Sequence, residues 1–346
     1  MGIQVKQTER VRRLTDVVGI ALGGSGICYV RVVRKKDVFE IVAIGETPGI
    51  DLPLTPSEAF NATLIVPKPY AAPYAAFAVE HPQCVMRLVN LKQRPEVDES
   101  AAISELFGTS PPQGYRIGFA DEIAGGAPDG RPDGAYLACG IPEYLAEAVA
   151  SLLPDSRRPA PASLQIAAEA RLNAFAMGPV SKHADECLVH LQVEASATSL
   201  SVFNNGHLAA YRLFPIGNDS VVEEVARQFG LPQDLAVEML CEDQIDTSSA
   251  ITPVLTPLFR QVGLSVDFVA RRENCRIARA FVSGRVSGIS NWLGMMDRTL
   301  SVSSSTWSPL KDYAMKFQQD MELAEGHDKA GHHAALGAAL ALMEGE

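Results

Sequence analysis

Two stretches of the sequence repeat one pattern, and this repetition limits the folds open to the chain more than any other feature. The first copy consists of apolar strands separated by tight turns, predicted at 17–22, 27–34 and 38–45. The second copy has the same layout, with strands predicted at 188–193, 198–203 and 207–214. Its second turn, Asn204-Asn205-Gly206, is typical of a β-hairpin. Two such meanders favour a duplicated α/β domain, although any mixed α/β chain can contain two meanders.

The region between the two copies has its own order of elements. Strands are predicted at 85–91, 115–119 and 135–139, and helices at 98–107 and 143–153. This order of strand, helix, two strands and helix is a compact unit inserted into the first half. A further helix is predicted at 162–176, before the second meander begins.

Helices dominate the sequence after the second meander. Ser220 and Glu223 form a capping-box pattern, and Gly230 stands where a glycine commonly ends a helix. Further helices are predicted from Pro232 to Cys241, across 251–269 with a kink at Pro257, and through Trp292. A strand is expected at 280–282, followed by a glycine-containing loop at 283–288. The Ala/Leu-rich helix at 333–343 is expected to pack in the core.

Composition narrows the function classes. The net charge of −11 over 346 residues argues against a nucleic-acid or anionic-lipid surface. The six cysteines are widely scattered without a C-x-x-C pair, which favours reduced thiols in a cytosolic protein and no structural metal. No run of about 18 apolar residues occurs, so no membrane-spanning helix is expected.

Four local motifs, in this order along the chain, carry a resemblance to a known family. They are the helix 162–175, the stretch from Pro215-Ile216-Gly217-Asn218 to Leu231, the loop Phe281-Val282-Ser283-Gly284 and the segment 334–340. Together they resemble the PilM proteins, which are related to FtsA and to the cytoplasmic domain of GspL. The resemblance implies an α/β, actin-like fold, a duplicated ribonuclease H-like architecture with a small α/β subdomain inserted.

The same resemblance divides the chain into four subdomains. Subdomain 1A is expected to comprise residues 1–84 plus 161–183, and the inserted subdomain 1C residues 85–160. Subdomain 2A is expected to comprise residues 184–217 plus 263–346, and subdomain 2B residues 218–262.

The nucleotide site that this fold implies has lost its charged residues. Active relatives carry an aspartate and a lysine in the first turn and an aspartate in the second, where this chain has Ala21, Cys28 and Gln192. Each lost charge-assisted contact is worth about 1.5–3 kcal/mol, and three such losses remove most of the ~8 kcal/mol behind micromolar binding. Glu194, on the second turn, would repel phosphates. The vestige of the site is predicted at Gly23, Gly24, Ser25, Gly26, Ala195, Ser196, Gly217 and Gly284.

These departures predict a non-enzymatic scaffold, with weak or absent ATP binding and no cofactor. The resemblance implies a partner of the PilN kind, a single-span inner-membrane protein whose N-terminal tail would lie beside Val85, Arg87 and Val89. The chain would then be cytoplasmic and peripheral to the inner membrane through this partner, and self-association stays open. An active actin-fold ATPase or kinase and an FtsA-like cell-division anchor are the alternatives.

Overall fold

A computed structural model describes residues 14–23, 26–36, 38–91, 114–120, 134–153, 159–242, 245–284, 289–315 and 330–344. The helix predicted at 98–107 and the segment 121–133 lie outside these residues.

The first half is built on a six-stranded sheet with the order β14-β3-β2-β1-β4-β8. Its strands are β1 (Asp16–Gly23), β2 (Gly26–Lys35), β3 (Val38–Thr47), β4 (Tyr74–Val79), β8 (Ala160–Ile166) and β14 (Ala314–Met315). The first three strands form the predicted antiparallel meander, while β4 runs parallel to β1 and β8 parallel to β4.

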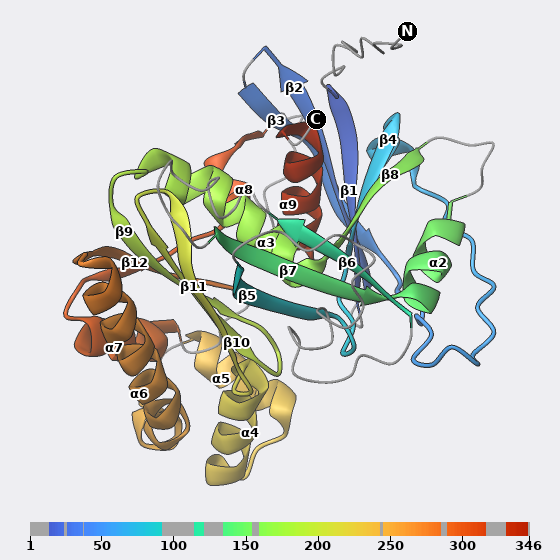
Figure 1. Cartoon of the computed structure of the whole chain (residues 1–346). Helices are drawn as coiled ribbons and strands as arrows, with labels where there is room; N and C mark the ends of the chain where they lie inside the picture. The colour runs from blue at the N-terminus through green and yellow to red at the C-terminus, as the bar shows by residue number, and fades with distance from the viewer. Residues whose placement is uncertain are drawn as a thin grey trace, which may run out of the picture.

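The second half repeats this topology in a five-stranded sheet with the order β11-β10-β9-β12-β13. Its strands are β9 (Cys187–Val193), β10 (Thr198–Asn204), β11 (His207–Phe214), β12 (Ile277–Gly284) and β13 (Ser304–Thr306). Again a meander is extended on one side by two parallel strands. The duplication predicted from the sequence is therefore confirmed (Figure 1).

The helix predicted at 162–176 is wrong in its first part. Residues 162–166 belong to strand β8, and the helix α3 (Ala167–Phe175) begins only after them. Ala162 and its neighbours favour a helix when they are considered alone. They form a strand because they pair with β4, and local propensity does not reveal such a distant partner. The strand β4, which was not predicted, lies inside the first sheet between β1 and β8.

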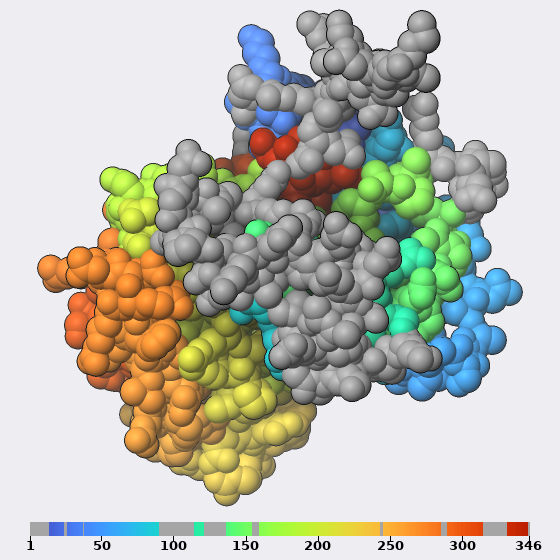
Figure 2. Space-filling model, viewed as in Figure 1, coloured from blue at the N-terminus to red at the C-terminus, as the bar shows by residue number. Residues whose placement is uncertain are grey.

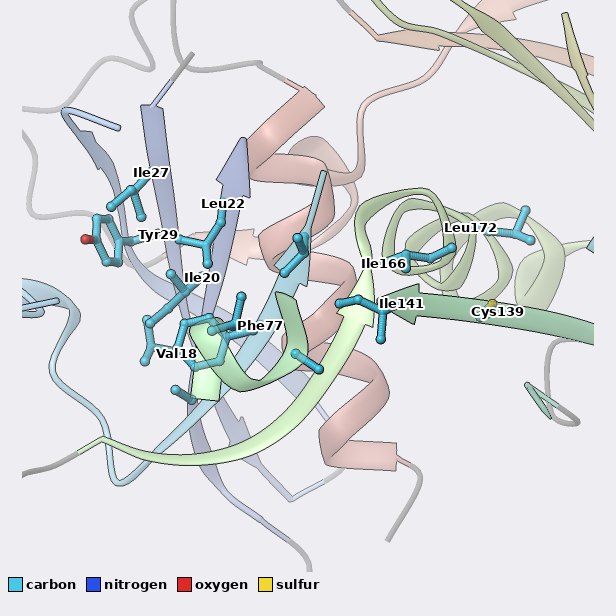
Figure 3. Close-up of a cluster of buried hydrophobic side chains, with 14 of the residues drawn as sticks. Val18, Ile20, Leu22, Ile27, Tyr29, Phe77, Cys139, Ile141, Ile166 and Leu172 are labelled. Atoms are coloured by element: carbon cyan, nitrogen blue, oxygen red, sulfur yellow. The ribbon is translucent and has the colours of Figure 1, made fainter. Parts of the chain in front are cut away.

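The inserted unit contains a three-stranded antiparallel sheet of order β5-β7-β6 and a helix. Its elements are β5 (Val85–Leu91), β6 (Tyr115–Ala120), β7 (Gly134–Pro142) and α2 (Glu143–Ser151). Many of its apolar side chains, among them Leu137, Ile141 and Leu145, belong to the same cluster as those of the first sheet, and Figure 3 shows Ile141 and Cys139 near Ile166 and Leu172. The inserted unit and the first half therefore share one core.

The C-terminal helix packs on the first sheet and on α3 at the centre of the molecule (Figure 1). The C-terminal helix α9 (Ala330–Glu344) packs against β1, β2, β4 and α3, and a π-helical turn, η2 (Ala176–Val180), follows α3 (Figure 1). Glycine makes this packing possible, because a Cβ at Gly19 would lie 1.7 Å from the Ala335 carbonyl oxygen and one at Gly337 would lie 1.7 Å from that of Ala170. The expectation that this Ala/Leu helix packs in the core is confirmed by the complete burial of residues such as Leu336 and Leu340.

The remaining helices cover the second sheet. They are α4 (Asn218–Phe229), α5 (Gln233–Glu242), α6 (Ser248–Glu273) and α7 (Ile289–Leu300), with the short α8 (Pro309–Asp312) and η1 (Lys68–Tyr70) elsewhere. Figure 2 shows α4 to α6, in yellow and orange, as a lobe at the bottom of that view. No helix among the described residues has the length and apolar character needed to cross a bilayer.

Of the two predictions made for the ends of α4, one is confirmed and the other is wrong. Gly230 ends the helix in the left-handed conformation, with φ 67°, as predicted. The capping box is wrong, because α4 begins at Asn218 after Gly217, and Ser220 lies inside its first turn. Gly217, in an extended conformation, is the residue before the first turn of the helix.

Candidate functional site

The first predicted turn joins β1 to β2. Gly23 and Gly26 are direct partners across the strands, and Gly26 has a φ of +144°, which favours glycine. The side chain nearest to a Cβ at Gly23 is that of Glu80, which follows β4. Gly24 and Ser25 lie outside the described residues.

The second turn, between β9 and β10, is enclosed by two glycines that the sequence predicted. A Cβ at Gly217 would lie 2.4 Å from the carbonyl oxygen of Ala195, and one at Gly284, whose φ is +102°, would lie 2.0 Å from that of Val193. Ala195 and Ser196 are exposed on the turn itself. The structure therefore brings Ala195, Ser196, Gly217 and Gly284 together at one end of the second sheet.

The N-terminus of α4 points its first N–H groups at this turn. The backbone N–H of Asn218 donates to the carbonyl oxygen of Glu194, and that of Asp219 donates to the carbonyl oxygen of Ala195, both at 2.8 Å. Free N–H groups at a helix N-terminus are the usual donors to a phosphate. Here two of them are already occupied within the protein.

An ion-pair chain links the two turns through Arg171 of α3. The Nε of Arg171 lies 2.9 Å from Oε1 of Glu194 on the second turn, and its NH1 donates to Oε2 of Glu80 at 3.3 Å, beside the first turn. The side chains of Arg171 and Glu194 are 7% and 15% exposed, whereas that of Glu80 is 52% exposed. Arg171–Glu194 is thus a buried pair, and Glu80 is its partly solvated third member.

Hydrogen bonds continue this chain into the second sheet. Nε2 of Gln192 donates to Oε1 of Glu194 at 3.0 Å, and the Ser283 hydroxyl donates to Oε1 of Gln192. The Nε2 of His190 lies at 2.5 Å from the Ser283 oxygen. Since the Ser283 proton is directed to Gln192, the histidine Nε2–H is the donor in this contact.

Burial strongly affects the pKa values of Glu194, Arg171 and His190. Burial raises the pKa of Glu194, and the charge of Arg171 opposes this rise. Burial disfavours the charge on Arg171, but Glu194 and Glu80 together keep its pKa above the usual value. Burial, and secondarily the neighbouring His333, lowers the pKa of His190 to about 3, so this histidine is neutral near pH 7.

An aromatic cluster fixes α3 to the second sheet beside this polar chain. The ring of Phe175 stacks on that of His190 with centroids 4.0 Å apart, and it meets Trp307 edge-on at 5.1 Å. Phe203 and Phe281 complete the cluster at 5.7 and 5.6 Å from Phe175. Arg171 is therefore held on a helix that contacts both halves of the molecule.

The positions at which active relatives carry charge are apolar or already bonded. Ala21 and Cys28 are paired across β1 and β2, are both 5% exposed, and belong to the cluster packed around α9. Glu194 was expected to face phosphates, whereas its carboxylate contacts Arg171 and Gln192. Glu80 and Arg171 were missed, although a single arginine inside an alanine-rich helix was a usable signal.

The predicted docking residues lie in the inserted sheet, away from these turns. Val85 and Val89 of β5 pack with Ile117 and Phe119 of β6 around the fully buried Ala138 of β7. Arg87, between the two valines in the sequence, is exposed. Among the described strands β5 pairs only with β7, so it is an edge strand, and β11 of the second sheet lies beside it (Figure 1).

Two sheets of the same topology, each a meander extended by two parallel strands, define a protein with an actin-like fold. The structure is similar to a chain of the PilM–PilN type IV pilus biogenesis complex, with a TM-score of 0.69 and 18% identity over 96% of this chain and 100% of that chain. The resemblance to PilM is therefore confirmed in the fold.

Other similar structures are more distant. A Bacteroides thetaiotaomicron protein described as having an actin-like ATPase fold and unknown function has a TM-score of 0.48 and 8% identity, with 87% of this chain and 93% of that chain covered. The ethanolamine utilization protein EutJ from Carboxydothermus hydrogenoformans has a TM-score of 0.41 and 13% identity, with 95% and 92% covered. No protein-family model and no curated protein matches the sequence.

Proposed function

We propose that this chain is a non-enzymatic scaffold of a type IV pilus or related secretion machine, which binds a PilN-like membrane protein. The observation that carries this proposal is the structural similarity to a chain of the PilM–PilN complex over nearly the whole length of both chains. The resemblance of four sequence motifs to PilM supports it independently of the fold.

The geometry between the turns supports a role without nucleotide chemistry. Mg²⁺ in nucleotide sites is held by carboxylates together with the phosphates, and Ala21 supplies none at the first turn. Gln192 replaces the carboxylate expected at the second turn, and its amide is already bonded to Glu194 and Ser283. The positive charge of Arg171 is already paired with Glu194 and Glu80, so it offers little attraction to a phosphate.

The edge strand β5 supports a docking place for an extended tail. A peptide that pairs with such an edge gains main-chain hydrogen bonds, and alternate side chains set its register. Val85 and Val89 provide an apolar face, and Arg87 places a positive charge between them. The proposed occupant is the N-terminal tail of a single-span PilN-like protein, which would hold this chain at the cytoplasmic side of the inner membrane.

A binding titration tests the docking place. A labelled synthetic peptide with the N-terminal sequence of a PilN-like protein from the same genome is titrated with the full-length chain, and binding is followed by fluorescence anisotropy. Arg87→Glu should weaken binding at least tenfold, which is about 1.4 kcal/mol, with little change in melting temperature. Arg260→Glu, an exposed charge reversal on α6, is the matched control and should bind like the wild type.

Two results would count against this assignment. Equal affinity of the wild type and Arg87→Glu would move the docking place away from β5. Absence of binding by the wild type, under conditions where the protein is folded, would remove the proposed partner altogether.

A further inference from the structure

Three residues that are far apart in the sequence meet at the start of α9. Cys28 of β2 and Glu46 of β3 are direct partners in the antiparallel register, so their side chains leave the sheet on the same face as close neighbours. His332, in the first turn of α9, lies over this face and is fully buried. Cys28 is 5% exposed and Glu46 is exposed, so the cluster reaches from the core to solvent.

The potential ligand atoms of these residues converge. The sulfur of Cys28, a ring nitrogen of His332 and a carboxylate oxygen of Glu46 all lie within 4.8 Å of one another. Around a tetrahedral zinc ion such atoms are about 3.3–3.6 Å apart, as follows from metal–ligand distances of about 2.0–2.3 Å. The atoms must therefore approach one another by at most about 1.3 Å, and rotation of the exposed Glu46 side chain can supply such a change.

The surroundings suit a metal ion in two further ways. Gly331 allows the start of α9 to approach the sulfur closely, because a Cβ at this position would lie 2.6 Å from Sγ of Cys28. The Nε2 of His332 lies 3.3 Å from the carbonyl oxygen of Gly45. A metal-binding histidine commonly donates its second ring N–H to such an oxygen, and this contact would present Nδ1 to the ion.

We propose that Cys28, Glu46 and His332 bind one transition-metal ion, with zinc as the best fit and water at the fourth position. Thiolate and imidazole ligands together select zinc over magnesium or calcium, which prefer oxygen ligands. The bound ion ties the first turn of α9 to β2 and β3. This inference rests on the fold alone and not on the proposed partner.

Cobalt substitution tests the site directly. The untagged full-length protein is stripped with a chelator under reducing conditions and titrated with Co²⁺, whose spectrum reports both ligand type and geometry. A thiolate-to-cobalt charge-transfer band and intense visible bands typical of four-coordination should saturate at one equivalent. Stoichiometric Zn²⁺ should bleach these bands, and it should raise the melting temperature because it binds the folded state.

Matched variants separate this site from adventitious binding. Cys28→Ser should abolish the charge-transfer band, whereas Cys241→Ser, which changes an exposed cysteine on α5, should leave it unchanged. Glu46→Gln, at an exposed position, should weaken cobalt binding at least tenfold. This variant still tests the metal site if Cys28→Ser does not fold. A wild-type protein without the band, or a band that survives Cys28→Ser or resists Glu46→Gln, overturns the proposal.

Discussion

Replacing Arg171 by methionine removes the central member of the ion-pair chain and leaves Glu194 without its cation. Arg171 and Glu194 are both largely buried, and breaking such a pair costs about 3–5 kcal/mol because a desolvated charge is left unpaired. The Glu80 contact adds little, since that side chain is half exposed and surface pairs contribute about 0–1 kcal/mol. Arg171→Met should therefore lower the free energy of unfolding by about 3 kcal/mol.

The double variant distinguishes a lost ion pair from a general packing defect. Arg171→Met combined with Glu194→Gln removes both charges, and replacement of a complete buried pair is often close to neutral. We expect it to regain about 2 kcal/mol relative to Arg171→Met, which is a coupling within the range seen for residues in contact. Glu80→Gln should cost less than about 1 kcal/mol.

Equilibrium urea unfolding provides the measurement. Fluorescence reports on Trp307 beside the Phe175 cluster and on Trp292 in the second core, and circular dichroism reports on the whole chain. Coincident transitions justify a two-state free energy. A loss below about 1 kcal/mol for Arg171→Met, or additive effects in the double variant, would refute a structural role for the pair.

Three further predictions concern the nucleotide site, the packing of α9 and the buried histidine. Calorimetric titration with Mg·ATP should give no affinity tighter than about 1 mM, and a magnesium-dependent micromolar affinity would contradict the degenerate site. Gly19→Ala should cost more than about 3 kcal/mol in thermal unfolding because its Cβ overlaps Ala335, whereas Gly118→Ala, with no atom within 4 Å, should stay within about 0.5 kcal/mol. His190, with its pKa lowered to about 3, contributes stability that is complete above pH 6.5. This stability is lost toward lower pH by about 1.4 kcal/mol per unit. His190→Asn should flatten the measured dependence, and an unchanged slope would show that the histidine is protonated in the folded state.

The sequence predicted those parts of the structure that depend on local pattern. Apolar strands separated by tight turns identified both meanders, and the Asn204–Gly206 turn marked a hairpin in the second, since strand and turn signals act over a few residues. Gly217 and Gly284 both lie against the turn between β9 and β10, where backbone approaches backbone and a Cβ would overlap it, while their assignment to a vestigial nucleotide site stays a prediction. The subdomain boundaries stay a prediction.

Features that depend on distant partners were not predicted. Strand β8 was taken for helix because its pairing with β4 is invisible in local propensity. Arg171 was overlooked because its two partners, Glu80 and Glu194, follow strands in different halves of the molecule. The convergence of Cys28, Glu46 and His332 likewise arises only when α9 packs on the first sheet.

We propose that this chain binds a PilN-like tail and that the binding needs no nucleotide. Calorimetric titration of the nucleotide-free, full-length protein with the synthetic tail peptide, repeated in the presence of Mg·ATP, tests both parts of this proposal together. We expect saturable binding of one peptide per chain, with the same affinity in both titrations. Absence of binding to the nucleotide-free protein, or binding that appears only when Mg·ATP is added, would contradict it.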